Sequence, residues 1–174
     1  MDIKNEALKY ANETFRESRD TVFFAMETII SILFYAKENG ILALAKDDFF
    51  RNGQMHILDV IEKRKQKIIN KNFLLFGLNC LIFGYDFGFL KEILENKFYV
   101  SCSGKETYIA YIYFLGIMGI AEGLSSEYMF ECFRSIIPDS QEEEFEKFEA
   151  RWKLDEKSMT KMGRIIQFGK KNNK

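Results

Sequence analysis

The stretch YIAYIYFLGIMGIA, residues 108–121, decides the fold because it is apolar on every side and carries no charge. A second such stretch, TVFFAMETIISILFYA at residues 21–36, contains a single charged residue, Glu27. The two stretches are 14 and 16 residues long, and a helix needs about 20 apolar residues to span a bilayer. Both are therefore predicted to be helices buried in the core of a soluble protein.

Proline occurs once in 174 residues, at Pro138. Because proline breaks helix interiors, this scarcity favours a chain made almost wholly of helices with short connections. The length suits one substantial core. We predict an all-α, single-domain bundle of about seven to eight helices over residues 1–154. A short helix and a basic, frayed C-terminal tail are predicted over residues 155–174.

Apolar residues at helical spacing predict further helices at residues 3–18, 20–39, 41–50, 54–70 and 87–98. Asp20 is predicted to cap the second of these and Gly40 to end it, because only glycine takes positive φ without steric cost. Asp86 is predicted to cap the last one. The segment NFLLFGLNCLIFG, residues 72–84, is apolar on nearly all sides and is predicted to lie at the centre of the core.

Serines mark three more helix starts. Ser103 and Glu106 have the spacing of a capping box before the stretch that begins at Thr107. Ser140 and Glu143 have the same spacing before the acidic stretch QEEEFEKFEARW. Ser125 is predicted to begin a helix between them that ends at Pro138.

The residue types that catalysis and metal binding require are poorly supplied. His56 is the only histidine, and the three cysteines are widely spaced without a CxxC pattern, which favours a reducing compartment over a metal cluster. Asp47 and Asp48 are adjacent, so on a helix they point about 100° apart and cannot share a ligand. We predict a protein that is not an enzyme and that holds no cofactor and no metal. The net charge of −1 gives no basic excess for nucleic acid.

Three glycines in FLGIMGIAEG (Gly116, Gly119 and Gly123) are spaced somewhat like a phosphate-binding loop. They lie in a helical pattern, however, and no strand is predicted before them. We predict that they allow helices to pack closely.

Two segments, AKENGILALA (36–45) and FLLFGLNCLIFGYDFGFLKEILENKF (73–98), resemble the cytoplasmic region of MotA, the flagellar stator subunit of the MotA/TolQ/ExbB family. The first is similar to a family segment written roughly ARREGLLALE, and the second to FLxxGLxLVVDGxDPExLxxILExE. Gly77, Gly84, Asp86 and the triplet 93–95 fall in register, and the order and spacing of the segments agree. The resemblance covers roughly residues 25–100.

This resemblance implies a stand-alone domain without the family's membrane helices, and it does not imply ion conduction. It also implies charge contacts with the rotor protein FliG. Lys37 stands at the first arginine of the family's basic pair, Glu38 replaces the second, and Ala45 replaces the family's glutamate.

The leading hypothesis is a protein-interaction module whose partner is a component of the flagellar rotor or stator, or of a related energy-transducing complex. The module is predicted to be cytoplasmic, at the inner face of the membrane through that partner. Phe49 and Phe50 are candidate apolar anchors. The predicted partner-binding residues are Lys37, Glu38, Lys46, Asp47, Asp48, Lys63, Arg64 and Lys67.

Two alternatives remain open. A helical regulator could bind a small apolar ligand in a cavity lined by Tyr108, Tyr111 and Tyr113. A structural homo-oligomer could instead pair the acidic stretch 142–149 of one copy with the basic tail 161–174 of another.

Overall fold

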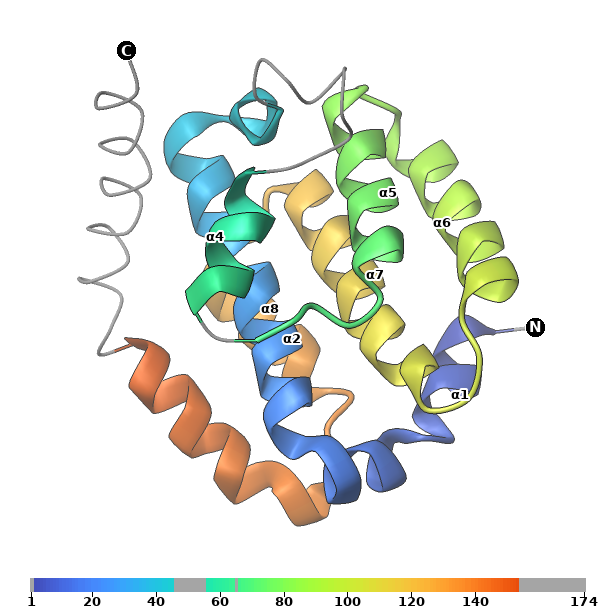
Figure 1. Cartoon of the computed structure of the whole chain (residues 1–174), viewed down its shortest axis with the longest axis vertical. Coiled ribbons are helices and arrows are strands. Elements are labelled where there is room, and N and C mark those ends of the chain that lie inside the picture. Colours follow the sequence, from blue (N-terminus) through green and yellow to red (C-terminus); the bar gives the residue numbers. More distant parts are fainter. Residues whose placement is uncertain (1, 46–55, 65, 154–174) are drawn as a thin grey trace.

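The computed structural model describes residues 2–45, 56–64 and 66–153, which form helices joined by short connections (Figure 1). The elements are α1 (Ile3–Leu8), α2 (Ala11–Asn39), the 3₁₀ helix η1 (Ile41–Leu44), α4 (His56–Arg64), α5 (Lys71–Ile82), α6 (Phe87–Ser101), α7 (Glu106–Glu122), α8 (Ser126–Arg134) and the 3₁₀ helix η2 (Asp139–Gln141), followed by helical residues 142–153. No strand occurs in these ranges, so the predicted all-α, single-domain bundle is confirmed. The short helix and tail predicted at 155–174 lie outside the described residues.

Helix α7 is the central element of the bundle. It packs against α1, α2, α5, α6 and α8, and nearly all of its residues are buried. The prediction that 108–121 is a buried helix is therefore confirmed. Within the described ranges, no helix combines the length and the hydropathy that crossing a membrane requires.

The prediction that residues 72–84 lie at the centre of the core is confirmed in part: most of α5 is buried in the core, but the central helix is α7. Helix α5 buries one face against α7 and the neighbouring α6, while Leu75 and Phe76 on its other side are only half-buried. The reason is its position in the outer layer of the bundle (Figure 1). High apolar content therefore does not by itself place a helix at the centre.

Glycines permit close packing around α7, as predicted for Gly116 and Gly119, whereas the prediction is wrong for Gly123, which has a φ of 69° and ends the helix. A Cβ atom added at Gly116 would lie 2.5 Å from Cδ1 of Ile29 on α2. A Cβ atom added at Gly77 on α5 would collide with Cδ1 of Ile117 on α7. Both contacts are closer than a real Cβ atom tolerates, so the absence of a side chain lets α2 and α5 approach the central helix.

One of the predicted boundaries near the N-terminus is wrong and one is confirmed. The predicted helix 3–18 is divided, because α1 ends at Leu8 and α2 already begins at Ala11. The predicted break between residues 18 and 20 is present as a kink inside α2 at Ser18, whose φ of −146° and ψ of 42° are not helical. The helical residues that follow run to Asn39, as predicted.

Two predicted caps are confirmed. The backbone N–H of Phe89 donates to Oδ1 of Asp86 over 3.1 Å at the start of α6. The backbone N–H of Tyr128 donates to Oγ of Ser125 over 3.4 Å at the start of α8. These side chains accept hydrogen bonds from backbone N–H groups that have no partner within their own helices. Helix α8 ends at Arg134, ahead of the predicted end at Pro138.

Neither predicted capping box forms. Helix α7 begins at Glu106 after Lys105, which makes no side-chain cap. Gly104 has a φ of 60°, and this turn separates Ser103 from the helix. Ser140 lies inside η2, where the N–H of Gln141 donates to the carbonyl of Pro138 over 2.8 Å.

Candidate functional site

The connection between α5 and α6 presents a cluster of exposed aromatic side chains. Its sequence is FGYDFGF, residues 83–89, and we call its four aromatic residues, Phe83, Tyr85, Phe87 and Phe89, the aromatic turn. These side chains are between 42 and 59% exposed. Scattered exposed apolar residues are ordinary, but a contiguous group of this kind marks an interaction surface.

The aromatic turn is held in one arrangement by its own contacts. The rings of Phe83 and Tyr85 are stacked with centroids 6.2 Å apart, and the rings of Tyr85 and Phe89 meet edge to face at 5.1 Å. Gly84 takes a φ of 71° where the chain reverses, and Asp86 caps α6. The carboxylate of Asp86 is the single charge in the turn.

The other segment of the stator resemblance lies at the same end of the bundle (Figure 1). Helix α2 ends at Gly40, whose φ of 83° confirms the predicted glycine terminator, although its ψ of 154° is extended rather than that of a left-handed helix. The following η1 packs against α5. Leu44 of η1 is buried, whereas Leu42 is 72% exposed. The two resembling segments thus form neighbouring parts of one surface.

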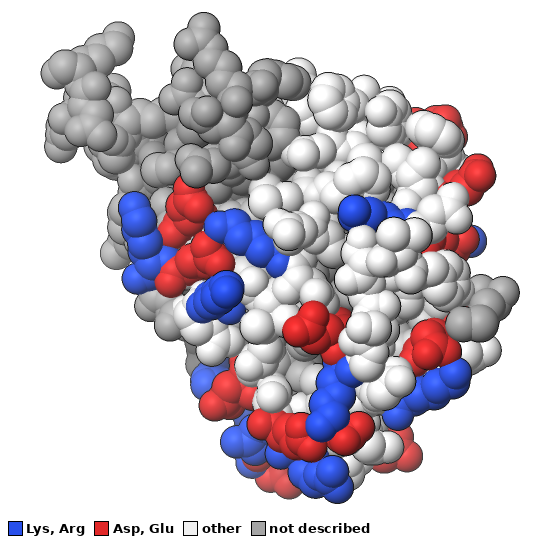
Figure 2. Space-filling view, turned by 45° about the vertical axis from the view of Figure 1, so that its right-hand side comes forward, with Lys and Arg blue, Asp and Glu red and all other residues white. Residues whose placement is uncertain are grey.

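Figure 2 shows how charge is distributed over this side of the molecule. Lysine, arginine, aspartate and glutamate side chains gather on its lower part and along its left edge. The described surface at the upper right, where the α5–α6 connection of Figure 1 comes forward, is largely uncharged, with basic atoms below it and acidic atoms at its right-hand edge. Low charge at the centre with charged residues around it is typical of a protein-binding surface.

The predicted charged residues of the first segment are only partly described. Lys37 and Glu38 are exposed in the last turn of α2. Helix α2 packs against α8; a hydrogen bond from Ser125 lowers the pKa of Glu127 on α8, and the positive charge of Lys37 contributes a smaller part. Lys46, Asp47, Asp48, Phe49 and Phe50 lie outside the described residues.

The predicted helix over residues 54–70 is shorter than expected, which separates the predicted basic residues Lys63, Arg64 and Lys67. Helix α4 ends at Arg64, so exposed Lys63 is helical while Lys67 follows in a non-helical segment. That segment is fixed because the N–H of Ile68 donates to Oε1 of Glu62 over 2.9 Å. The structure therefore does not place Lys63, Arg64 and Lys67 along one helix.

The tyrosines proposed to line a ligand cavity are part of the core. Tyr108 and Tyr113 are fully buried. The hydroxyl of Tyr108 donates to the carbonyl of Ile136 over 2.9 Å, and its ring lies 5.8 Å from that of Phe15. Burial raises the pKa of Tyr111 to about 12. The phenols of Tyr108 and Tyr111 therefore remain protonated at neutral pH.

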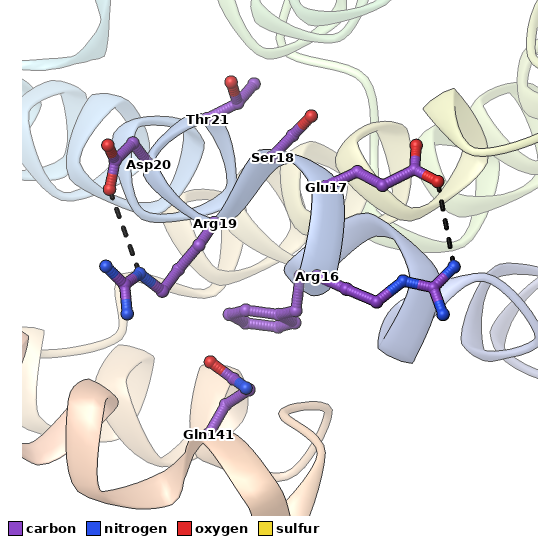
Figure 3. A pocket seen from close by; sticks show the side chains of 8 residues that line it. Arg16, Glu17, Ser18, Arg19, Asp20, Thr21 and Gln141 are labelled. Atoms are coloured by element: carbon purple, nitrogen blue, oxygen red, sulfur yellow. Dashed lines mark ion pairs between the residues drawn. The ribbon is translucent and has the colours of Figure 1, made fainter.

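A surface hollow of about 520 Å³ lies at the kink of α2 (Figure 3). Two arginines flank it, and both have partners: Arg16 lies 3.8 Å from Glu17, and Arg19 lies 4.0 Å from Asp20. Figure 3 shows the Ser18 side chain pointing away from Gln141 on the opposite wall. The polar groups therefore do not converge on a common point, as a ligand site requires.

The described cysteines are poor nucleophiles. Burial is the main cause that raises the thiol pKa of Cys80, Cys102 and Cys132, and that of Cys102 rises to about 11. Since the thiolate is the reactive form, these thiols are weakly reactive at neutral pH. Among the described residues, no group of His, Cys, Asp or Glu side chains gathers as a metal site.

Acidic side chains of residues 142–153 are largely paired within the chain. Nη2 of Arg134 on α8 lies 2.6 Å from Oε2 of Glu149, and Nζ of Lys153 lies 2.6 Å from its Oε1. Lys147 lies within 3.0 Å of Glu144. These contacts attach the last described helix to α8 and leave fewer free carboxylates for the tail of another copy.

The aromatic turn was missed by the sequence reasoning, although a signal was present. The four aromatic residues alternate at positions 83, 85, 87 and 89. Alternation is not helical spacing, so residues in this pattern cannot all face a helical core. A turn that joins two helices and alternates in this way predicts aromatic side chains on the surface.

Comparison with known protein families, with curated proteins and with solved structures finds no match.

Proposed function

We propose that the protein is a non-enzymatic interaction module that binds a protein partner at the end of the bundle carrying the aromatic turn and η1. The observation that carries the proposal is the exposure of four aromatic side chains at one connection, three of which contact one another through the ring of Tyr85. Aromatic residues dominate the binding energy of protein interfaces when they are exposed in the free protein and buried in the complex. Leu42 extends the apolar surface at the same end.

The charged residues near this surface have a different role in the proposal. Lys37 and Glu38 are exposed, and exposed charges at the rim of an interface act mainly on orientation and association rate. The aromatic side chains supply affinity, and the rim charges guide approach.

The finer part of the proposal concerns the identity of the partner. The segments that resemble the MotA cytoplasmic region, 36–45 and 73–98, contain η1 and the aromatic turn. This coincidence supports a component of the flagellar rotor or stator, or of a related energy-transducing complex, as the partner. The protein would then work in the cytoplasm, at the inner face of the membrane.

The test is a binding titration of the purified chain against FliG and the stator proteins of the same organism. Phe87→Ala should weaken binding about tenfold or more, which corresponds to about 1.4 kcal/mol. Tyr128→Ala is the matched control, because Tyr128 is a 68% exposed aromatic residue on α8, outside the aromatic turn. Lys37→Glu should lower the association rate and change its dependence on salt.

Two outcomes would count against the proposal. If neither rotor nor stator proteins bind, the flagellar assignment fails. If a partner binds equally well to the wild type and to Phe87→Ala, the aromatic turn is not its docking surface.

A further inference from the structure

The aromatic turn contains a carboxylate that has no counter-charge among the described residues. Asp86 is exposed, and its Oδ1 accepts the N–H of Phe89 over 3.1 Å. No lysine or arginine within residues 2–45, 56–64 or 66–153 forms an ion pair with it. The cap occupies one oxygen only, so the carboxylate keeps acceptor capacity for a second donor.

Glu92 adds a second negative charge on the same side of α6. It is exposed and lies three residues after Phe89, just as Asp86 lies three residues before it. Helical residues three apart are neighbours on the surface, so Phe89 stands between the two acidic residues. Glu92 too forms no ion pair within the part of the chain that the structure describes. This side of the helix is therefore both aromatic and negative.

The two lysines of α6 do not compensate these charges. Lys91 follows Phe89 by two residues, which places it about 200° away around the helix, and its Nζ lies 3.8 Å from Oε1 of Glu95. Nζ of Lys97 lies 5.4 Å from the ring centre of Phe76 on α5. Both cations thus have partners away from the aromatic turn.

The rings beside Asp86 leave faces open to a cation. Tyr85 and Phe89 are both exposed, and their planes meet at 76° with ring centroids 5.1 Å apart. The glycines between the aromatic residues carry no side chain that would cover them. Apart from chain neighbours, a Cβ atom added at Gly84 would meet nothing within 4 Å, and one added at Gly88 would meet only Oδ1 of Asp86. The face of an aromatic ring is negative and attracts cations.

A purely apolar partner would cover this surface at a high cost in free energy. Covering the aromatic side chains also removes Asp86 from water, and an ionised carboxylate is costly to bury without a counter-charge. A partner that supplies a cation avoids this cost. The chemistry of the turn therefore favours a partner that brings a positive charge to it.

An arginine within the chain shows the arrangement that such a cation can take. Cζ of Arg134 lies 5.2 Å from the ring centre of Phe145, and its Nη2 lies 2.6 Å from Oε2 of Glu149. A planar guanidinium stacks on a ring and donates to a carboxylate at the same time, whereas the ammonium of lysine is a point charge with no plane to stack. The aromatic turn offers a ring and a carboxylate without the cation.

We propose that the aromatic turn receives an arginine side chain of its protein partner. The guanidinium stacks in the corner between Tyr85 and Phe89 and donates to the carboxylate of Asp86, and Glu92 strengthens the local negative field. This inference rests on the proposed function, because it names the group with which that partner docks on the same surface. Arginine is also among the residues that carry most of the binding energy at protein interfaces.

Titration of the ¹⁵N-labelled full chain with N-acetyl-arginine amide, at constant ionic strength, tests the arginine site without a known partner. The probe should shift the backbone amide signals of residues 84–89. Its dissociation constant should be on the order of 10–100 mM, because one cation–π contact and one exposed ion pair are each weak. N-acetyl-citrulline amide, which has nearly the same shape without the charge, should bind at least about threefold more weakly. N-acetyl-lysine amide should also bind more weakly than the arginine probe.

Two variants separate the charge and the ring from other roles of these residues. Asp86→Asn keeps the cap, because asparagine caps helices as well as aspartate does, and Tyr85→Leu keeps an apolar side chain without a ring. Each should weaken binding of the arginine probe at least about threefold. Asp2→Asn is the matched control, because Oδ1 of Asp2 accepts the N–H of Lys4 over 2.9 Å at the start of α1. It should leave probe binding unchanged.

Three results would overturn the proposal: a citrulline or lysine probe that binds as well as the arginine probe, amide shifts confined to residues outside the turn, or an Asp86→Asn chain that binds the arginine probe as the wild type does. The proposed function fails separately. If no rotor or stator protein binds while the arginine probe behaves as expected, the partner assignment fails and the arginine site stands. If Phe87→Ala weakens a partner while Asp86→Asn does not, the docking surface stands and the arginine inference fails.

Discussion

Replacement of Gly116 by alanine tests the packing at the centre of the bundle. The added methyl group would lie 2.5 Å from both Cγ1 and Cδ1 of Ile29. Ile29 is fully buried, and its β-branched side chain is confined to one main rotamer in a helix, so α2 and α7 must move apart. Overpacking of this kind destabilises by about 1–3 kcal/mol, and the better helix propensity of alanine returns about 1 kcal/mol. Because three atoms of Ile29 are affected, we expect the cost to lie in the upper half of that range, and Gly116→Ala to lower the free energy of unfolding by about 1–2 kcal/mol net.

Urea unfolding followed by far-ultraviolet circular dichroism measures this change. Gly88→Ala is the matched control, because its methyl group would meet only Oδ1 of Asp86 at 3.4 Å, and it should be neutral or stabilising by up to about 1 kcal/mol. In an Ile29→Ala background the steric conflict is removed, so Gly116→Ala should stabilise there. If Gly116→Ala destabilises equally in both backgrounds, Ile29 is not the cause and the packing argument fails.

Three further substitutions probe contacts that hold the bundle together. Arg134→Met should lower the free energy of unfolding by about 1–3 kcal/mol, because it leaves the buried carboxylate of Glu149 paired with Lys153 alone. Urea titration followed by Trp fluorescence would measure this change, and an unchanged free energy would contradict the Arg134–Glu149 pairing. Tyr108→Phe should lower the free energy of unfolding by about 1–2 kcal/mol in the same assay, because the carbonyl of buried Ile136 loses its hydrogen-bond donor. Burial raises the pKa of Glu62, but hydrogen bonds, chiefly from Lys71, lower it by more, so the net pKa lies below its ordinary value. The stabilisation that ionised Glu62 contributes is therefore present above the unfolded pKa of about 4.3 and is lost as the pH falls through the lower folded pKa. The difference in unfolding free energy between the wild type and Glu62→Gln should shrink over that pH interval. A difference that does not depend on pH would refute the stabilising role of the Glu62 carboxylate.

Much of the fold could be predicted because helix packing follows local rules. The apolar stretch 108–121 was too short to span a membrane and too apolar to face water, so burial was the remaining choice. Caps at Asp86 and Ser125 were predictable because the side chain and the N–H that it accepts are close in sequence. The capping box at Ser103 failed because the turn at Gly104, two residues before the helix, redirects the chain.

The candidate site was less predictable, for a physical reason. Whether a residue is exposed depends on which face of its helix is covered by neighbouring helices. A single sequence does not state which helices are neighbours. The outer face of α5 looked like core because its composition is apolar, whereas it lies in the outer layer. Charged residues such as Lys37 were predicted to be exposed and are, but exposure alone does not distinguish a binding residue from an ordinary surface residue.

The aromatic turn differs from the rest of the described residues, among which most phenylalanines are buried. Burying a phenylalanine side chain stabilises a fold by about 1.5–3 kcal/mol, and Phe98, on the same helix as Phe87 and Phe89, is fully buried. The exposed side chains are also not free to move independently, because the rings contact one another and Asp86 caps the helix. Ordering a side chain at an interface costs about 0.5–1.5 kcal/mol, and part of that loss has already occurred in the folded chain. A partner that covers the turn therefore gains apolar burial at reduced entropic cost, which is the property expected of a binding surface and not of an ordinary helix connection.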